Sequence, residues 1–259
     1  MRTYEAIDII SKTIIADGLC EAILMKGSIG RGDDDAYSDV DMYAVVKKDV
    51  MELFLEKRIT YLNSYLPTLY LEHVNFVGEQ IVAIFQNGLH FDLYAVTEET
   101  LPHTDQAKII YDPNHKYDDY IAEVKTLSID QLAGYFNDAL YYFIEADGAY
   151  NRKNYPWASM IMSSSIAESA ILLRYLYDKD YAYLGLKKIN EIIPTEQFSW
   201  LSEASANMNK EGFLVGTNYI IKILDYVVQH IDNDIRSRLN LTFFQWIKAN
   251  LGSSLFVLE

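Results

Sequence analysis

Residues 22–46 read AILMKGSIGRGDDDAYSDVDMYAVV, and this stretch decides the fold that we predict. The apolar run 22–26 is typical of a short buried strand that ends at Gly27. The glycines of residues 27–32 predict a turn, and the three aspartates of 33–35 predict a polar loop. Residues 40–46 are rich in β-branched and aromatic side chains, which predicts a second strand.

Two acidic residues, Asp39 and Asp41, stand at the start of the second predicted strand. Side chains two residues apart on a strand point to the same face, so the apolar side chains of Val40 and Met42 face the other way. Two neighbouring carboxylates repel each other unless a cation lies between them, and Mg²⁺ prefers such oxygen ligands. A solvated edge strand with two exposed acids gives the same pattern, so the pair alone leaves both interpretations open.

The glycine-rich turn offers groups that suit a phosphate. Gly27 lets a ligand approach the backbone closely, and Ser28 adds a hydroxyl beside the N–H groups of the turn. Arg31 supplies a fork of donors that matches phosphate oxygens. The alternative is an ordinary loop with a surface arginine. The acidic pair that follows 12 and 14 residues after Gly27 makes the phosphate interpretation more specific.

A third acid, Asp92, lies within the strand-like run 89–96, LHFDLYAV. Phe91 and Leu93 flank it and point to the opposite face. An aspartate within a buried strand is costly unless it is paired or bound to a metal. If this strand lies beside the one that carries Asp39 and Asp41, three carboxylates meet on one face. That arrangement is typical of sites that hold two metal ions about 3.5–4 Å apart for phosphoryl or nucleotidyl transfer.

The rest of the chain predicts an α+β protein with a mixed β-sheet in its N-terminal part and an all-helical C-terminal part. We expect two domains, 1–115 and 116–259. In the first, helices are predicted at 3–17 and 50–65, and strands at 69–77, 81–86 and 89–96, with a hairpin at Asn87-Gly88. In the second, a period of 3.6 residues predicts helices at 129–151, 158–177, 186–193, 196–207, 212–231 and 236–250.

Composition excludes several classes of protein. The chain has 259 residues, a net charge of −15 and one cysteine, which exclude a disulfide scaffold and a cysteine-based zinc site. Its acidity argues against a nucleic-acid partner and favours a cationic one. No apolar run is long enough for a signal peptide or a membrane span, so we expect a cytoplasmic protein without a membrane partner.

The Gly27-Ser28 turn, the acid-x-acid strand and the later Asp92 together resemble the DNA polymerase β-type nucleotidyltransferase superfamily. Within that superfamily, the stretch GSIGRGDDDAYSDVDMYAVV is most similar to the antibiotic nucleotidyltransferases of the kanamycin (aminoglycoside) type, and the lincosamide group shares the same core. The resemblance implies an N-terminal nucleotidyltransferase (catalytic) domain. It further implies a helical domain for substrate binding and dimerisation, and hence a possible homodimer.

The resemblance also implies a reaction and its residues. A nucleoside monophosphate, AMP from ATP, would move to a hydroxyl of a small cationic molecule such as an aminoglycoside, with release of pyrophosphate. Mg²⁺ would be the cofactor. The residues that this implies are Asp39, Asp41 and Asp92 as metal ligands and catalytic residues, Gly27, Ser28, Arg31 and Ser38 as nucleotide-binding residues, and Glu145 as the general base.

Several alternatives stay open at this stage. Asp147, Glu168 or Asp92 could be the base in place of Glu145. The chain could instead modify a protein or an RNA, as antitoxin-type relatives do, although an RNA substrate calls for a basic surface that this composition lacks. It could also be a non-catalytic relative, but the complete set of serine and aspartates argues against that.

Overall fold

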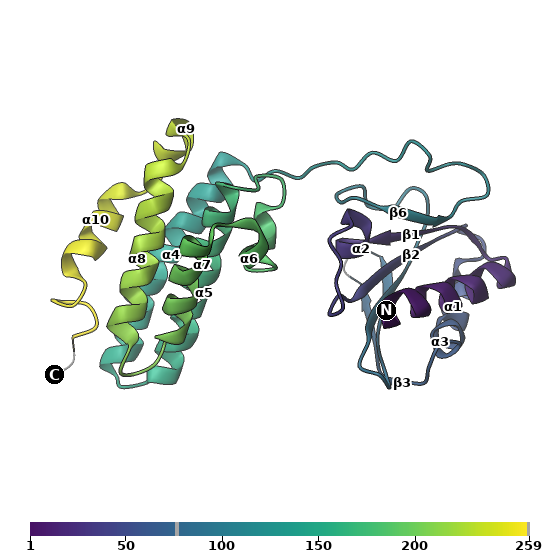
Figure 1. The fold of residues 1–259 in the computed structure, drawn as a ribbon, viewed down its shortest axis with the longest axis horizontal. Coiled ribbons are helices and arrows are strands. Elements are labelled where there is room, and N and C mark those ends of the chain that lie inside the picture. The colour runs from purple at the N-terminus through teal and green to yellow at the C-terminus, as the bar shows by residue number, and fades with distance from the viewer. Residues whose placement is uncertain (76–77, 258–259) are drawn as a thin grey trace. The chain divides into compact units, whose positions relative to one another are not determined.

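The computed structural model describes residues 1–75 and 78–257, and the chain divides into two compact units, Met1–Val124 and Lys125–Glu259. The first unit combines a β-sheet with helices and the second is helical, so the predicted α+β class is confirmed (Figure 1). Residues 116–124, which the sequence assigned to the helical part, belong to the first unit. The reason is that Tyr117 and Tyr120 pack against its sheet.

The first unit is built on a six-stranded sheet with the strand order β3-β4-β5-β2-β1-β6. Neighbouring strands pair antiparallel at every step except between β2 and β5, which run parallel. The strands are β1 (Cys20–Lys26), β2 (Val40–Val46), β3 (Thr68–Asn75), β4 (Glu79–Phe85), β5 (His90–Val96) and β6 (Lys108–Tyr111).

Three features of this unit differ from the sequence prediction. Residues 27–32 were expected to form a turn, but they form the short helix α2 (Gly27–Arg31), which ends where Gly32 turns left-handed with φ 78°. The edge strand β6 was not predicted, because its four residues stand among turn-forming residues. The strand expected at 69–77 corresponds to β3, and its last two residues lie outside the described part of the chain.

The two faces of the sheet are covered differently. Helices α1 (Arg2–Asp17) and α3 (Met51–Asn63) pack on one face, and the inward side chains of β1, β2, β4 and β5 fill the core beneath them (Figure 1). The opposite face holds a smaller cluster in which Leu101 and Tyr117 cover Tyr43 and Tyr94. Alternation along β2 and β5 therefore places Asp41 and Asp92 on the face away from the helices, next to this smaller cluster.

The second unit is a bundle of helices around one large core. Its first helix begins with a capping box, in which Ser128 and Gln131 exchange side-chain and backbone hydrogen bonds. The helix expected at 236–250 is interrupted, because Asn240 caps a new helix, and the helix expected at 186–193 is reduced to four residues. The helices are α4 (Ile129–Asn151), α5 (Tyr155–Tyr175), the 3-10 turn η1 (Ala182–Leu184), α6 (Ile189–Ile192), α7 (Thr195–Ala206), α8 (Phe213–His230), α9 (Asn233–Arg236) and α10 (Leu241–Asn250).

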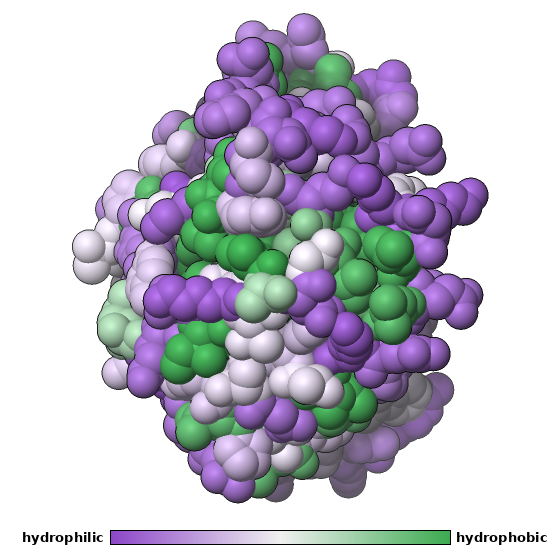
Figure 2. Space-filling model, turned by 90° about the vertical axis from the view of Figure 1, so that its right-hand side faces the viewer, coloured by the Kyte–Doolittle hydropathy of each residue, from purple (hydrophilic) through white to green (hydrophobic). Residues whose placement is uncertain are grey.

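The surface carries scattered apolar side chains. Figure 2 shows one face of the molecule, on which patches of hydrophobic residues lie among hydrophilic ones. In the first unit, Leu53 and Ile59 on α3 and Leu69 and Tyr70 on the edge strand β3 are exposed. Single exposed apolar residues are ordinary on protein surfaces, so they do not define a site. Within residues 1–75 and 78–257, no helix combines the length and the apolar character that crossing a bilayer requires.

Phe54→Ala is expected to lower the free energy of unfolding by about 3–5 kcal/mol, because it leaves a cavity between α3 and the sheet. Phe54 is fully buried, whereas its neighbour Leu53 on the same helix is 44% exposed and serves as the control. Leu53→Ala should change the same quantity by less than about 0.5 kcal/mol. Urea unfolding followed by circular dichroism measures both, and equal losses in the two variants would contradict the packing described for α3.

Candidate functional site

The turn between β1 and β2 leaves no room for a side chain at Gly27. Its φ of +59° lies in the left-handed region, and a Cβ atom there would stand 2.1 Å from Oδ2 of Asp41. The carboxylate of Asp41 therefore packs directly against the backbone of Gly27, an approach that only glycine permits. The start of α2 and the acid of β2 are in this way fixed to one another.

Ser28, the next residue, has a buried hydroxyl without a partner. The residue is 2% exposed, and its Oγ forms no hydrogen bond to any described residue. Leaving a buried polar group unsatisfied costs about 1–3 kcal/mol. A phosphate oxygen would satisfy this hydroxyl by accepting a hydrogen bond from it.

Two of the three aspartates predicted from the sequence, Asp41 and Asp92, lie on one face of the sheet. Asp41 and Asp92 are direct partners across the parallel strands β2 and β5, and Asp39 immediately precedes β2. Asp92 is 8% exposed, while Asp39 and Asp41 are half-buried. The strand adjacency on which the metal-site hypothesis depends is therefore present.

The charges of these aspartates act on the same neighbours. Nε2 of His90 lies 3.0 Å from Oδ1 of Asp92, and this hydrogen bond is the largest cause that raises the pKa of His90, with Asp39 and Asp41 adding to it. Burial raises the pKa of Tyr94 most, and the same three carboxylates raise it further. One patch of negative potential therefore surrounds the start of β2 and β5.

These carboxylates are not gathered around a single point. Among residues 1–75 and 78–257, no three His, Cys, Asp or Glu side chains stand close enough to hold a metal ion together. One oxygen of Asp92 is engaged with His90, and Oδ2 of Asp41 lies against Gly27. The donor set and the strand register fit Mg²⁺, but coordination requires the side chains to turn toward a common point.

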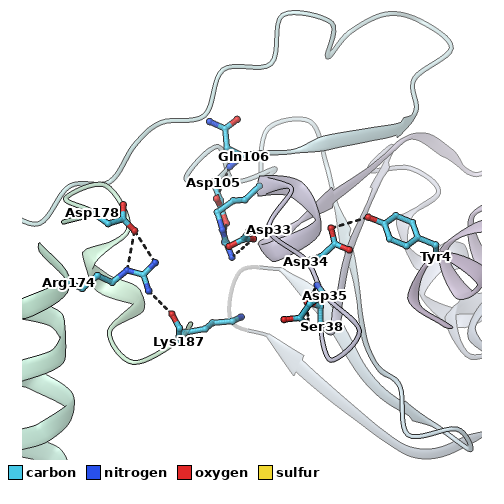
Figure 3. A network of polar contacts seen from close by, with 11 residues as sticks. Tyr4, Asp33, Asp34, Asp35, Ser38, Asp105, Gln106, Arg174, Asp178 and Lys187 are labelled. Carbon is cyan, nitrogen blue, oxygen red and sulfur yellow. Dashed lines mark hydrogen bonds and ion pairs between the residues drawn. The ribbon is translucent and has the colours of Figure 1, made fainter. Parts of the chain in front are cut away.

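Arg31 and Ser38 are engaged in contacts of their own. The guanidinium of Arg31 pairs with Asp105 at 2.8 Å and with Asp33 at 3.4 Å, which ties α2 to the segment that follows β5. The hydroxyl of Ser38 accepts the N–H of Asp35 at 2.9 Å and so closes the acidic loop before Asp39. Figure 3 shows the acidic residues of these contacts, with Asp33 beside Asp105 and Asp35 beside Ser38.

An aromatic pair and a buried lysine complete this face of the sheet. Tyr43 and Tyr94 stack with their ring centroids 4.1 Å apart, and the ammonium of Lys26 lies 5.5 Å from the centroid of Tyr43. Burial lowers the pKa of Lys26 to about 8. The sequence analysis missed Lys26, although a lysine that closes an apolar strand directly before Gly27 was a signal that could have found it.

The candidate bases in the helical unit have unlike surroundings. Glu145 is exposed and accepts the hydroxyl of Tyr141 at 2.9 Å, whereas Oδ1 of Asp147 accepts the backbone N–H of Phe256 at 2.6 Å. Oε2 of Glu168 is buried without a partner among the described residues. Burial raises the pKa of Glu168, and the charge of Asp138 adds to that rise.

Comparisons with known proteins find distant similarity among solved structures. No protein-family model matches the chain, and no curated protein matches it. The chain is similar to the crystal structure of an aminoglycoside 6-adenyltransferase from Bacillus subtilis, with 8% sequence identity and a TM-score of 0.35 over 95% of this chain and 99% of that chain. A similarity this distant does not establish a family, so conclusions about function rest on the chain's own residues.

Gly27→Ala is expected to lower the free energy of unfolding more than Gly32→Ala. Both glycines have positive φ, so both variants lose roughly 1–2 kcal/mol from backbone strain. A Cβ at Gly32 meets nothing within 4 Å, whereas one at Gly27 displaces the carboxylate of Asp41, which adds about 1–3 kcal/mol. Urea titration of the two variants measures the difference, and equal losses would refute the close contact between Gly27 and Asp41.

Proposed function

We propose that the protein is a magnesium-dependent nucleotidyltransferase. It moves a nucleoside monophosphate, AMP from ATP, to a hydroxyl of a small cationic acceptor of the aminoglycoside type and releases pyrophosphate. One observation carries this proposal. Asp41 and Asp92 are partners on the parallel strands, Asp39 precedes them, and the unpartnered hydroxyl of Ser28 lies in the adjacent turn.

Asp39, Asp41 and Asp92 would hold the metal. Bound Mg²⁺ supplies positive charge that neutralises the phosphates and favours the ionised acceptor hydroxyl. The proposal requires the carboxylate of Asp92 to exchange its hydrogen bond with His90 for the metal. Because Asp41 is packed against Gly27, Asp39 and Asp92 would have to turn toward it to share a metal ion.

The turn would bind the triphosphate. The Ser28 hydroxyl would donate a hydrogen bond to a phosphate oxygen, while the space beside Gly27 is taken by the carboxylate of Asp41. The ion pairs of Arg31 and the loop closure by Ser38 favour a supporting role for these two residues over direct contact with nucleotide. They keep α2 and the acidic strand in place, so catalysis depends on them through positioning.

The chemical step is an in-line displacement. The acceptor oxygen attacks the α-phosphorus and forms a new P–O bond, while the bond to the bridging oxygen breaks and its electron pair leaves with pyrophosphate. A carboxylate takes the proton of the hydroxyl. We propose Glu145 for that role. Glu168 is the second candidate, because a carboxyl whose pKa is raised by burial is a better proton acceptor than an exposed one.

The acceptor class follows from charge. A chain with a net charge of −15 attracts polycations and repels the phosphates of RNA. Incubation with labelled ATP, Mg²⁺ and a panel of aminoglycosides and lincosamides tests this directly. A mass gain of one nucleotide on a drug supports the proposal. Label on a protein or an RNA instead, or no pyrophosphate release with any acceptor, would replace it with one of the alternative functions.

Asp39→Asn and Asp41→Asn are each expected to lower kcat roughly a thousandfold, since several kcal/mol of charge stabilisation are lost with the metal. Chelation of Mg²⁺ by EDTA should abolish activity in the same assay. Asp49→Asn is the matched control, because Asp49 is an exposed aspartate in the loop after β2. Near wild-type rates in either site variant would refute the metal role of that aspartate.

Glu145→Gln and Glu168→Gln separate the two candidate bases. Loss of the base should lower kcat by about 10²–10⁴-fold and remove the acidic limb of the pH–rate profile, with KM little changed. Substitution of the glutamate that is not the base should leave kcat and the pH–rate profile as in the wild type. If neither substitution lowers kcat, the base role passes to Asp92 or Asp147.

A further inference from the structure

The segment Pro102–Gln106 is fastened to the glycine-rich turn of the first unit. The ammonium of Lys26, the residue before Gly27, donates a hydrogen bond to the carbonyl oxygen of Pro102. At the other end of α2, Arg31 pairs with Asp105 at 2.8 Å. Both ends of the turn are thus tied to five consecutive residues that lie far along the chain.

The same segment touches the middle of the turn through backbone. A Cβ atom at Gly30 would stand 2.4 Å from the carbonyl oxygen of Gln106 and 2.8 Å from that of Met25. Gly30 is therefore the residue that lets the segment lie against α2, just as Gly27 lets Asp41 lie against its start. The turn is held between β2 on one side and this segment on another.

Tyr120 connects the segment to Lys26. Its hydroxyl accepts a hydrogen bond from the Lys26 ammonium at 2.9 Å and donates one to the carbonyl oxygen of Asp105, also at 2.9 Å. Its ring stacks on His103, with centroids 4.8 Å apart. Lys26 also lies 5.4 Å from the centroid of the Tyr120 ring. One tyrosine thus contacts the lysine, the segment and the histidine within it.

Lys26 is poorly placed to contact a nucleotide itself. The residue is 4% exposed, and two of its three protons point to Pro102 and Tyr120. Burying an ammonium group is costly unless it is paired or hydrogen-bonded, so the burial of Lys26 at this position needs an explanation. Its contacts indicate that the reason is attachment of the segment to the turn.

We propose that Lys26 and Tyr120 are positioning residues that hold the segment Pro102–Gln106 on α2. By holding α2, they keep the Ser28 hydroxyl in its position next to Asp41. The consequence for nucleotide affinity rests on the proposed function. The consequence for the order of the turn does not, because it concerns hydrogen bonds that are present within the chain itself.

Hydrogen exchange in the full chain without nucleotide tests the order of the turn. The amides of Gly32 and Asp33 both donate to the carbonyl oxygen of Ser28, at 2.9 Å and 3.0 Å, so they report whether α2 is formed. Tyr120→Phe is expected to speed exchange at these amides about tenfold. The control is Tyr117→Phe, since Tyr117 is buried in the same region and its hydroxyl has no partner among the described residues. Equal exchange in the two variants would overturn the proposal.

Mg-ATP binding by calorimetry gives the second readout. Tyr120→Phe and Lys26→Met should each raise the Kd for Mg-ATP about tenfold, whereas Tyr117→Phe should have the wild-type Kd. Weaker binding in Lys26→Met alone would make Lys26 a direct phosphate ligand and overturn its positioning role. If the wild-type chain does not bind Mg-ATP, the proposed function fails, while the exchange experiment still decides whether Lys26 and Tyr120 order the turn. Should Lys26→Met fail to fold, the pair of tyrosine variants keeps both readouts.

Discussion

The parallel pairing of β2 with β5 is the constraint on which the candidate site depends. Two parallel strands cannot be joined by a tight hairpin, so the chain leaves β2, forms α3, β3 and β4, and returns to β5 beside its starting point. The register of that pairing sets Asp41 opposite Asp92. Because α3 packs on the opposite face of the sheet, this connection does not cover Asp41 and Asp92.

Close backbone contacts at two glycines then fix the position of α2 next to this acidic face. Gly27 and Gly30 each stand where a Cβ atom would collide, the first with a carboxylate and the second with two carbonyl oxygens. A buried ammonium and an arginine that pairs with two acids supply local positive charge in a chain of net charge −15. Substitutions at Gly27 and Gly30 are therefore expected to act by displacing these neighbouring atoms and not through helix propensity.

Sequence reasoning succeeded where the signal is local. The β-branched and aromatic residues of 40–46 predicted β2 to its end residues, and the alternation of side chains along a strand predicted the face of Asp41 and Asp92. It failed where the structure depends on distant partners. The edge strand β6 and the link from Lys26 to Tyr120 arise from contacts that span many residues, and no periodicity encodes them. The helix at 27–31 was missed because its glycines predict a turn. The roles of the site residues stay predictions, since geometry alone does not assign chemistry.

The division into two units has a spectroscopic consequence. All three tryptophans, Trp157, Trp200 and Trp246, belong to the helical unit, and Met1–Val124 contains none. Indole fluorescence therefore reports on the bundle, where Trp200 packs edge-on against Tyr226. A single tryptophan introduced on the sheet would give each half of the molecule its own optical signal, so that their melting could be followed separately in one sample.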